Sequence, residues 1–154
     1  MLVIKQQGDN MIDSFDRYKY LLGETIMLYQ LMENDLKLMF VGMCSGDFDA
    51  NLEKVKATYK GLGQIVQALE QLDNSDSSPY FNEETYRLLN RLARQRNYYC
   101  HQCCVDFCYN PYFRDTEEYK VALSKLEKTN EIIKSIIEQT NDHRERILSR
   151  YNRS

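Results

Sequence analysis

The chain has 154 residues, and its 20 Lys and Arg against 23 Asp and Glu give a net charge of −3. This length and the 43% hydrophobic content predict one globular domain over residues 1–154 and exclude disorder as the main state. No stretch approaches the roughly 18 apolar residues of a membrane span, and the first apolar run is too short for a signal peptide. We therefore expect a cytoplasmic protein without membrane contact, and the mild acidity argues against a general binder of duplex DNA.

Apolar side chains recur at three- and four-residue intervals along most of the chain, which is the period of an amphipathic helix. The pattern predicts four helices, over residues 11–43, 51–72, 82–107 and 116–151. Asn82 is the expected N-cap of the third helix, and Asp115 or Thr116 that of the fourth. Gly61 and Gly63 either weaken the second helix or allow another helix to approach closely. The predicted fold is all-α, an up-and-down four-helix bundle.

Four of the five cysteines lie between Cys100 and Cys108. An odd number in one short segment does not fit a secreted disulfide scaffold, so reduced thiols are expected. The spacing resembles part of a zinc site, but one helix cannot close a tetrahedron around the ion. We interpret these cysteines as small core residues and expect no metal and no cofactor.

The third predicted helix carries one charged residue where its apolar seam should continue. The seam contains Leu89, Ala93, Arg96, Cys100, Cys103 and Phe107. In the first helix, Glu33 interrupts an apolar seam with the same spacing. Because a buried guanidinium is costly without a partner, one hypothesis pairs Arg96 with Glu33 across the bundle. The alternative is that both side chains extend to the solvent at the edge of the core.

A basic stripe on the third helix leads to a histidine. Arg87, Arg91, Arg94 and Tyr98 follow at helical spacing and precede His101. The stripe is either a solvated face paired with glutamates or a phosphate-binding surface, because arginine grips phosphate through two hydrogen bonds. A histidine beside such a surface suits general acid–base chemistry on a phosphodiester. Arg91 and Arg94 are therefore candidate RNA-binding residues, with Tyr98 as a base-stacking one.

The segment Arg96-Asn97, followed by three residues and His101, resembles the Arg-x4–6-His signature of HEPN (higher eukaryotes and prokaryotes nucleotide-binding) domains. In that family the arginine is commonly followed by a small polar residue such as Asn. The motif lies on the third helix of a four-helix bundle, which matches its predicted place here. The fold resemblance covers residues 11–151, whereas the residue-by-residue match is limited to these three.

The resemblance implies a metal-independent endoribonuclease, often a toxin or phage-defence effector with a cognate antitoxin. Such domains act as homodimers in which two copies of the motif meet in a cleft. By analogy, Arg96 holds the scissile phosphate, His101 transfers protons and Asn97 orients the site, while the RNA supplies its own 2′-hydroxyl. Arg94, seven residues before His101, is a second candidate for the phosphate-binding arginine.

Two other functions stay open. The first is a non-catalytic helical module for interaction or for nucleotide or RNA binding, in which the Arg and His are structural. The second is a metal-dependent helical enzyme using Glu24, Glu33 and Asp35, although no Glu-x-x-His pair completes such a site. Five basic residues near the end of the chain either attract RNA or complement the dipole of the last helix; they are His143, Arg144, Arg146, Arg150 and Arg153.

Overall fold

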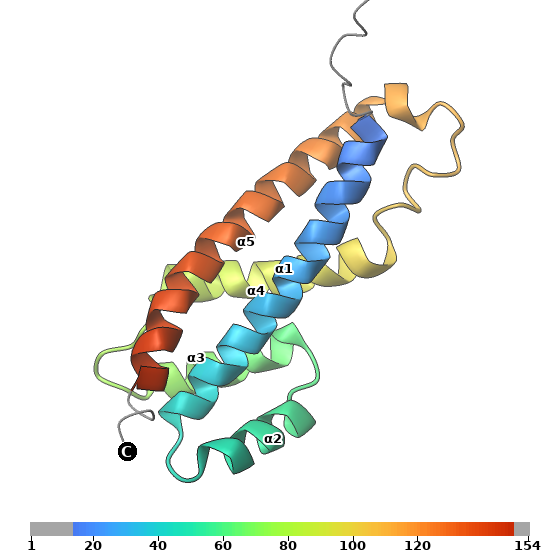
Figure 1. The fold of residues 1–154 in the computed structure, drawn as a ribbon. Helices are drawn as coiled ribbons and strands as arrows, with labels where there is room; N and C mark the ends of the chain where they lie inside the picture. The colour runs from blue at the N-terminus through green and yellow to red at the C-terminus, as the bar shows by residue number, and fades with distance from the viewer. Residues whose placement is uncertain (1–13, 150–154) are drawn as a thin grey trace, which may run out of the picture.

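A computed structural model gives the fold and describes residues 14–149 (Figure 1). Its elements are α1 (Ser14–Met43), α2 (Phe48–Thr58), α3 (Leu62–Asn74), α4 (Glu83–His101), the 3₁₀ turn η1 (Phe113–Asp115) and α5 (Glu117–Ser149). No strand occurs in this range, which confirms the all-α prediction. The predicted first residues of the first helix and last residues of the fourth lie outside the described range.

The two long helices, α1 and α5, lie side by side and run in the same direction (Figure 1). The ion pairs that join them advance together along both helices, from Arg17–Glu127 at 2.7 Å to Asp35–Arg144 at 2.7 Å. A strict up-and-down order would make the first and last helices antiparallel, so that part of the prediction is wrong. The reason is that the connection after α4 carries the chain back to the end where α1 begins.

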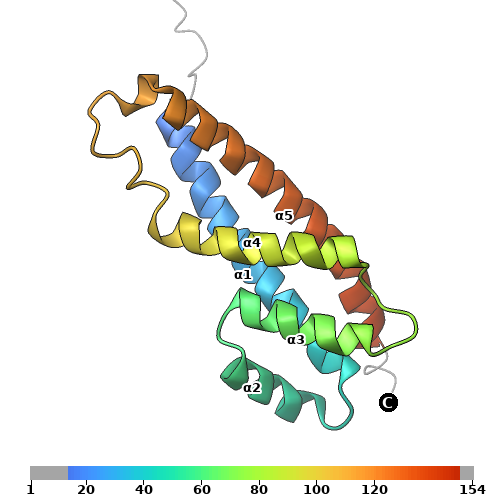
Figure 2. The same ribbon diagram turned by 180° about the vertical axis from the view of Figure 1, so that it is seen from behind.

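Helix α4 crosses one face of the α1–α5 pair, and α3 lies beside α4 on that face (Figure 2). The core between these layers contains side chains from each of them, including Leu36, Leu69, Leu89, Leu126 and Ile133, all fully buried. Helix α2 packs on α1 at the end of the molecule. This arrangement leaves both flanks of α4, toward α3 and toward α5, available for surface hollows.

The segment predicted as one second helix is two helices, α2 and α3, separated at residues 59–61. Tyr59 and Gly61 have extended backbone conformations, and the Lys60 amide donates to the Gln64 side chain at 2.8 Å. Gly61 lies at the break, which agrees with the prediction that the glycines weaken the helix. A Cβ at Gly63 would lie 3.9 Å from the Ala93 Cβ, an ordinary van der Waals distance, so the packing of α3 on α4 does not require a glycine there.

A buried carboxylate fixes the connection that leads into α4. Asp73, in the last turn of α3, accepts hydrogen bonds from the Tyr80 amide at 2.8 Å, the Phe81 amide at 3.0 Å and the Tyr86 hydroxyl at 2.6 Å. At the start of α4 the Asn82 side chain accepts from the Thr85 amide at 2.8 Å, which confirms the predicted N-cap. These contacts set the position from which α4 starts.

Helix α4 ends at His101 and not at Phe107 as predicted. The chain leaves the helix after Gln102 because Phe107 is buried in an aromatic cluster at the start of α5. Phe107 packs against Tyr18 at 5.3 Å between ring centroids, and against Phe113 and Tyr119 at 5.4 and 5.3 Å. Burying this aromatic cluster at the start of α5 offsets the helical hydrogen bonds given up.

The seam predicted for the third helix is displaced near its end, where Tyr99 is buried and Cys100 is exposed. At the start of α5, the structure selects Thr116 from the two candidate caps. Its hydroxyl accepts from the Tyr119 amide at 3.3 Å and donates to the Phe113 carbonyl at 2.6 Å.

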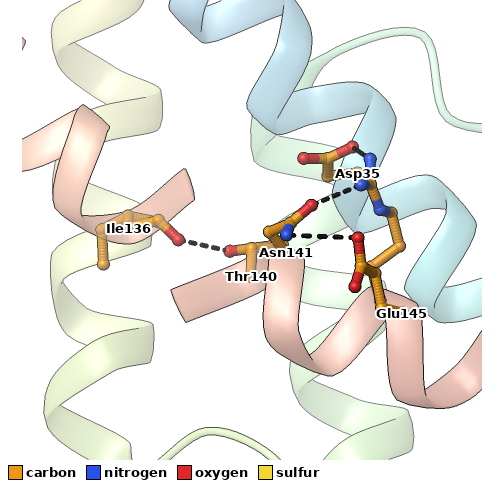
Figure 3. Close-up of polar contacts among 6 residues, drawn as sticks. Asp35, Ile136, Thr140, Asn141 and Glu145 are labelled. Atoms are coloured by element: carbon orange, nitrogen blue, oxygen red, sulfur yellow. Dashed lines mark hydrogen bonds and ion pairs between the residues drawn. The ribbon is translucent and has the colours of Figure 1, made fainter. Parts of the chain in front are cut away.

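Arg144 joins the end of α5 to α1 by hydrogen bonds to two residues that are labelled in Figure 3, Asp35 and Asn141. Its guanidinium donates to the nearly buried Asp35 carboxylate at 2.7 Å and also to the Asn141 side-chain oxygen. Neither interpretation of the basic C-terminal residues included an ion pair with another helix. Arg150 and Arg153 lie beyond the described residues.

The Arg144→Ala variant should lose about 2–3 kcal/mol of unfolding free energy, because it leaves the Asp35 carboxylate without its partner in a site nearly closed to water. The measurement is urea unfolding followed by circular dichroism. Arg146→Ala, which removes an exposed arginine two residues away, is the matched control and should change stability by less than about 0.5 kcal/mol. Equal losses in the two variants would contradict the assignment.

His143 should make the fold less stable as the pH falls. Burial lowers its pKa below the ordinary value of 6.5, and the nearby Arg146 lowers it further. The unfolded chain then binds the proton more tightly, so stability falls as the pH drops through about 6.5. His143→Phe keeps the ring contacts with Tyr80 and Phe81 without the titration, so its urea midpoint should fall less between about pH 7.5 and about pH 5.5. An identical fall would exclude His143 as the cause.

Candidate functional site

Arg96 does not form the pair with Glu33 that one of the two hypotheses proposed. The Glu33 carboxylate accepts from Lys37, one turn further along α1, at 2.8 Å. Within residues 14–149, the Arg96 side chain takes part in no hydrogen bond or ion pair, although its charge acts on the buried Tyr29 of α1. The i,i+4 lysine is the nearer cation on the same helix, so Glu33 is satisfied without crossing to α4. Arg96 is therefore not held by a structural ion pair.

The half-buried Arg96 lines a hollow between α3 and α4, which we call the α3–α4 cavity. Its volume is about 560 Å³. It is lined by Lys60, Gly61, Leu62, Gly63, Gln64, Gln67, Asn90, Ala93, Arg94, Arg96 and Asn97. Asn97 is exposed on the same wall as Arg96, so the structure brings these two motif residues together. Lys60, from the break between α2 and α3, adds a cation that was not predicted from the sequence.

A second hollow of about 560 Å³, the α4–α5 cleft, lies on the other flank of α4. It is lined by Arg91, Arg94, Gln95, Tyr98, Tyr99, Lys125, Lys128, Thr129 and Ile132. The Tyr99 and Thr129 hydroxyls, both buried, lie 3.3 Å apart and connect the two helices there. All three predicted RNA-binding residues meet in this cleft, and Arg94 lines both hollows.

Tyr98 presents its ring to the cleft in a fixed orientation. Its hydroxyl donates to the Asp106 carboxylate at 3.0 Å, and its ring packs edge-on against Tyr99 at 5.3 Å. Burial and the Asp106 hydrogen bond raise the pKa of Tyr98 to about 12, so the phenol is neutral at physiological pH. The ring is therefore a neutral, preorganised surface for a planar group.

The basic side chains on these two flanks of α4 form no ion pair in the described chain, and the carboxylates bonded to the linings, Asp106 and Glu70, accept from Tyr98 and Asn90 instead. No Asp or Glu lines the α3–α4 cavity or the α4–α5 cleft. In the described range, Arg91, Arg94, Lys125 and Lys128 form no ion pair, whereas Arg87 pairs with Glu83 as a solvated face would. In a chain of net charge −3, this concentration of cations favours a polyanionic ligand.

The contribution of α5 to the cleft was not predicted, but the sequence carries a signal for it. Lys125 has Val121 and Thr129 four residues before and after it, so no carboxylate is placed for an i,i+4 pair. Such an unpaired lysine on a long helix suggests an external partner. Lys125 faces α4 because of tertiary packing, which cannot be predicted from the local sequence.

His101, the last residue of α4, is exposed and lines neither hollow. Within the described chain its side chain forms no hydrogen bond, so no contact there assigns the imidazole a structural role. The structure thus places Arg96 and Asn97 in one hollow and leaves His101 outside it.

The acidic residues considered for a metal enzyme are dispersed among separate partners. Glu24 accepts from Asn130 at 2.9 Å and pairs with Lys134 at 3.2 Å, and each contact lowers the pKa of its carboxyl. Glu33 is paired with Lys37 and Asp35 with Arg144. Over residues 14–149, no three His, Cys, Asp or Glu side chains gather in a way that could hold a metal ion.

The four cysteines at the end of α4 and just after it form no disulfide in the described chain. Cys103 is buried and its sulfur lies 3.8 Å from that of Cys104, while Cys100 and Cys108 are exposed. The interpretation as core residues therefore applies to Cys103 but not to the two exposed cysteines. Burial and the neighbouring Cys103 raise the pKa of Cys104 to about 12, which keeps its thiol protonated.

A scan against protein-family models found no matching family, and searches of curated proteins and of solved structures found no similar protein. Among the described helices, none combines the length and the apolar character needed to cross a membrane. The structure therefore shows an all-helical protein in which the basic helix α4 is bordered by two open hollows.

Proposed function

We propose that this protein is a HEPN-type, metal-independent endoribonuclease that works as a homodimer in the cytoplasm. Arg96 binds the scissile phosphate, Asn97 orients the site and His101 transfers protons. The all-helical fold is proposed to be a HEPN-like variant of the helical bundle, with α4 as the motif helix. A protein antitoxin is the partner that the resemblance to toxins implies.

The unpaired state of Arg96 carries the proposal. A structural arginine in this seam would be satisfied by a buried carboxylate, since an unpaired guanidinium is costly to bury. Here its candidate partner Glu33 is held by Lys37, and Arg96 is exposed to an open cavity beside Asn97. Solvent-accessible His101, just over one turn further on, also lacks a structural contact in the described range. All three motif residues are thus available to a ligand.

The chemistry needs only these side chains and the RNA. The 2′-hydroxyl oxygen attacks the phosphorus as the bond from phosphorus to the 5′-oxygen breaks. In the proposed dimer one His101 takes the proton of the 2′-hydroxyl and the other His101 gives a proton to the departing 5′-oxygen, while Arg96 stabilises the charge on the phosphoryl oxygens. The products are a 2′,3′-cyclic phosphate and a 5′-hydroxyl.

Helix geometry supports the homodimer. Five residues along an α-helix place Arg96 and His101 about 140° apart around the axis of α4. His101 lies outside the cavity that Arg96 lines. The proposed site therefore draws on two chains, each of which brings an Arg96 and a His101 to a shared cleft.

A non-catalytic RNA- or nucleotide-binding module is the second candidate. It is favoured by the α4–α5 cleft, whose four cations and tyrosine suit nucleic acid whether or not cleavage follows. The two candidates share the ligand and differ in whether the Arg96–His101 motif breaks a bond.

The experiment that separates them is incubation of the purified protein with single-stranded RNA in EDTA. The proposal predicts cleavage that EDTA does not inhibit, with 2′,3′-cyclic phosphate and 5′-hydroxyl ends on the products. Binding without cleavage across varied RNA sequences would favour the module. Cleavage abolished by EDTA would contradict the metal-independent mechanism.

A further inference from the structure

We infer that the α4–α5 cleft binds a single-stranded segment of RNA, with its phosphates on Arg91, Arg94, Lys125 and Lys128 and a base on Tyr98. The identification of the ligand as RNA rests on the proposed function. The cleft itself is defined by contacts within one chain, so it does not depend on the homodimer.

Four basic side chains gather in the α4–α5 cleft. Two arginines of α4 and two lysines of α5 meet there although the helices are far apart in sequence. None of the four has an ion-pair partner in the described chain, and no carboxylate lines the cleft. Four like charges in one hollow repel one another, and a phosphate backbone relieves that repulsion while releasing its own counterions.

The aromatic ring of Tyr98 forms part of the wall of the cleft. Tyr98 is held by Asp106 and Tyr99, so its ring loses little freedom when a planar group stacks on it. Ile132, also in the lining, adds apolar surface beside the cations. Cations along a groove together with a rigid ring form the usual platform for unpaired bases, and such stacking tolerates any base.

The shape of the cleft favours a single strand over a duplex. A hollow of about 560 Å³ is in the size range of small-ligand sites and lies between two helices. A duplex stacks its base faces on one another and cannot place one on Tyr98. Arg94 also lines the α3–α4 cavity, so a bound strand continues over α4 to Arg96 and Asn97.

The test is fluorescence anisotropy with a 2′-O-methyl oligonucleotide of about 12 nucleotides, a length that covers the usual single-strand site sizes. This probe cannot be cleaved through a 2′-hydroxyl. The Lys125→Ala/Lys128→Ala variant should bind it roughly tenfold more weakly. Its log–log salt slope should be shallower by about 0.7 for each phosphate that the variant no longer neutralises.

Lys54→Ala/Lys56→Ala on α2 is the matched control, because it removes the same charge from exposed positions away from the cleft. We expect it to bind like the wild type. The inference is overturned if the two double variants bind equally, if the wild type does not bind the probe, if duplex RNA binds as tightly, or if an acidic peptide competes as effectively.

The outcomes for this cleft and for the proposed function are separable. A wild type that binds the probe through Lys125 and Lys128 but cleaves no RNA supports the cleft and contradicts the nuclease. A wild type that cleaves RNA while the lysine variant binds normally supports the nuclease and overturns the cleft.

Discussion

The His101→Ala variant should cleave RNA roughly 10²–10⁴-fold more slowly than the wild type, which is the range attributed to a positioned general acid or base. The His101 side chain is exposed at the end of α4 and forms no hydrogen bond in the described chain, so its removal should leave stability within about 0.5 kcal/mol. The slower cleavage would therefore come from the chemical step and not from unfolding. The measurement is the initial rate of RNA cleavage in EDTA, with folding checked by circular dichroism.

Gln102→Ala is the control for this variant, because Gln102 is the neighbouring exposed residue at the same helix end. It should retain wild-type activity. If His101→Ala and Gln102→Ala cleave at the same rate, His101 does not transfer the protons and the proposed mechanism is wrong.

The Asp73→Ala variant should lose about 4 kcal/mol of unfolding free energy, the largest loss of stability that we expect from one substitution. Asp73 is 1% exposed and accepts from the Tyr80 and Phe81 amides and the Tyr86 hydroxyl. Its removal leaves three donors without an acceptor in the interior, each costing about 1–3 kcal/mol. The measurement is the midpoint and slope of urea unfolding.

Asp73→Asn keeps one acceptor oxygen, so it should lie between the wild type and the alanine variant. Asp76→Ala, in the same connection but exposed, should lose no more than about 1 kcal/mol. Equal midpoints for Asp73→Ala and Asp76→Ala would show that the three hydrogen bonds do not hold α4 in place.

The all-helical character of the chain and the cap at Asn82 were the parts of the fold that could be predicted from the sequence. The 3.6-residue period of apolar side chains and a short polar residue before it, as at Asn82, are local signals. The end of α4 was not predictable in this way. Phe107 continues the helical spacing, yet the chain leaves the helix because that ring is buried among aromatic residues distant in sequence.

In the candidate site too, residues that share one helix could be predicted from the sequence, whereas contacts between helices could not. The basic stripe of α4 was evident from the sequence, because its residues share one helix. The proposed Glu33–Arg96 pair was wrong, because seam spacing specifies which face a residue occupies and not which cation its carboxylate meets. Lys60 and Lys125 were missed because they reach α4 only through the packing of α3 and α5.

The central claim is that Arg96 serves RNA cleavage and not the core. The measurement that tests it most directly compares Arg96→Ala with Arg87→Ala in RNA cleavage with EDTA present. Both variants remove an arginine from α4, but Arg87 is exposed and pairs with Glu83. We expect Arg96→Ala to be folded and inactive and Arg87→Ala to cleave like the wild type. Equal cleavage by the two variants would contradict the account.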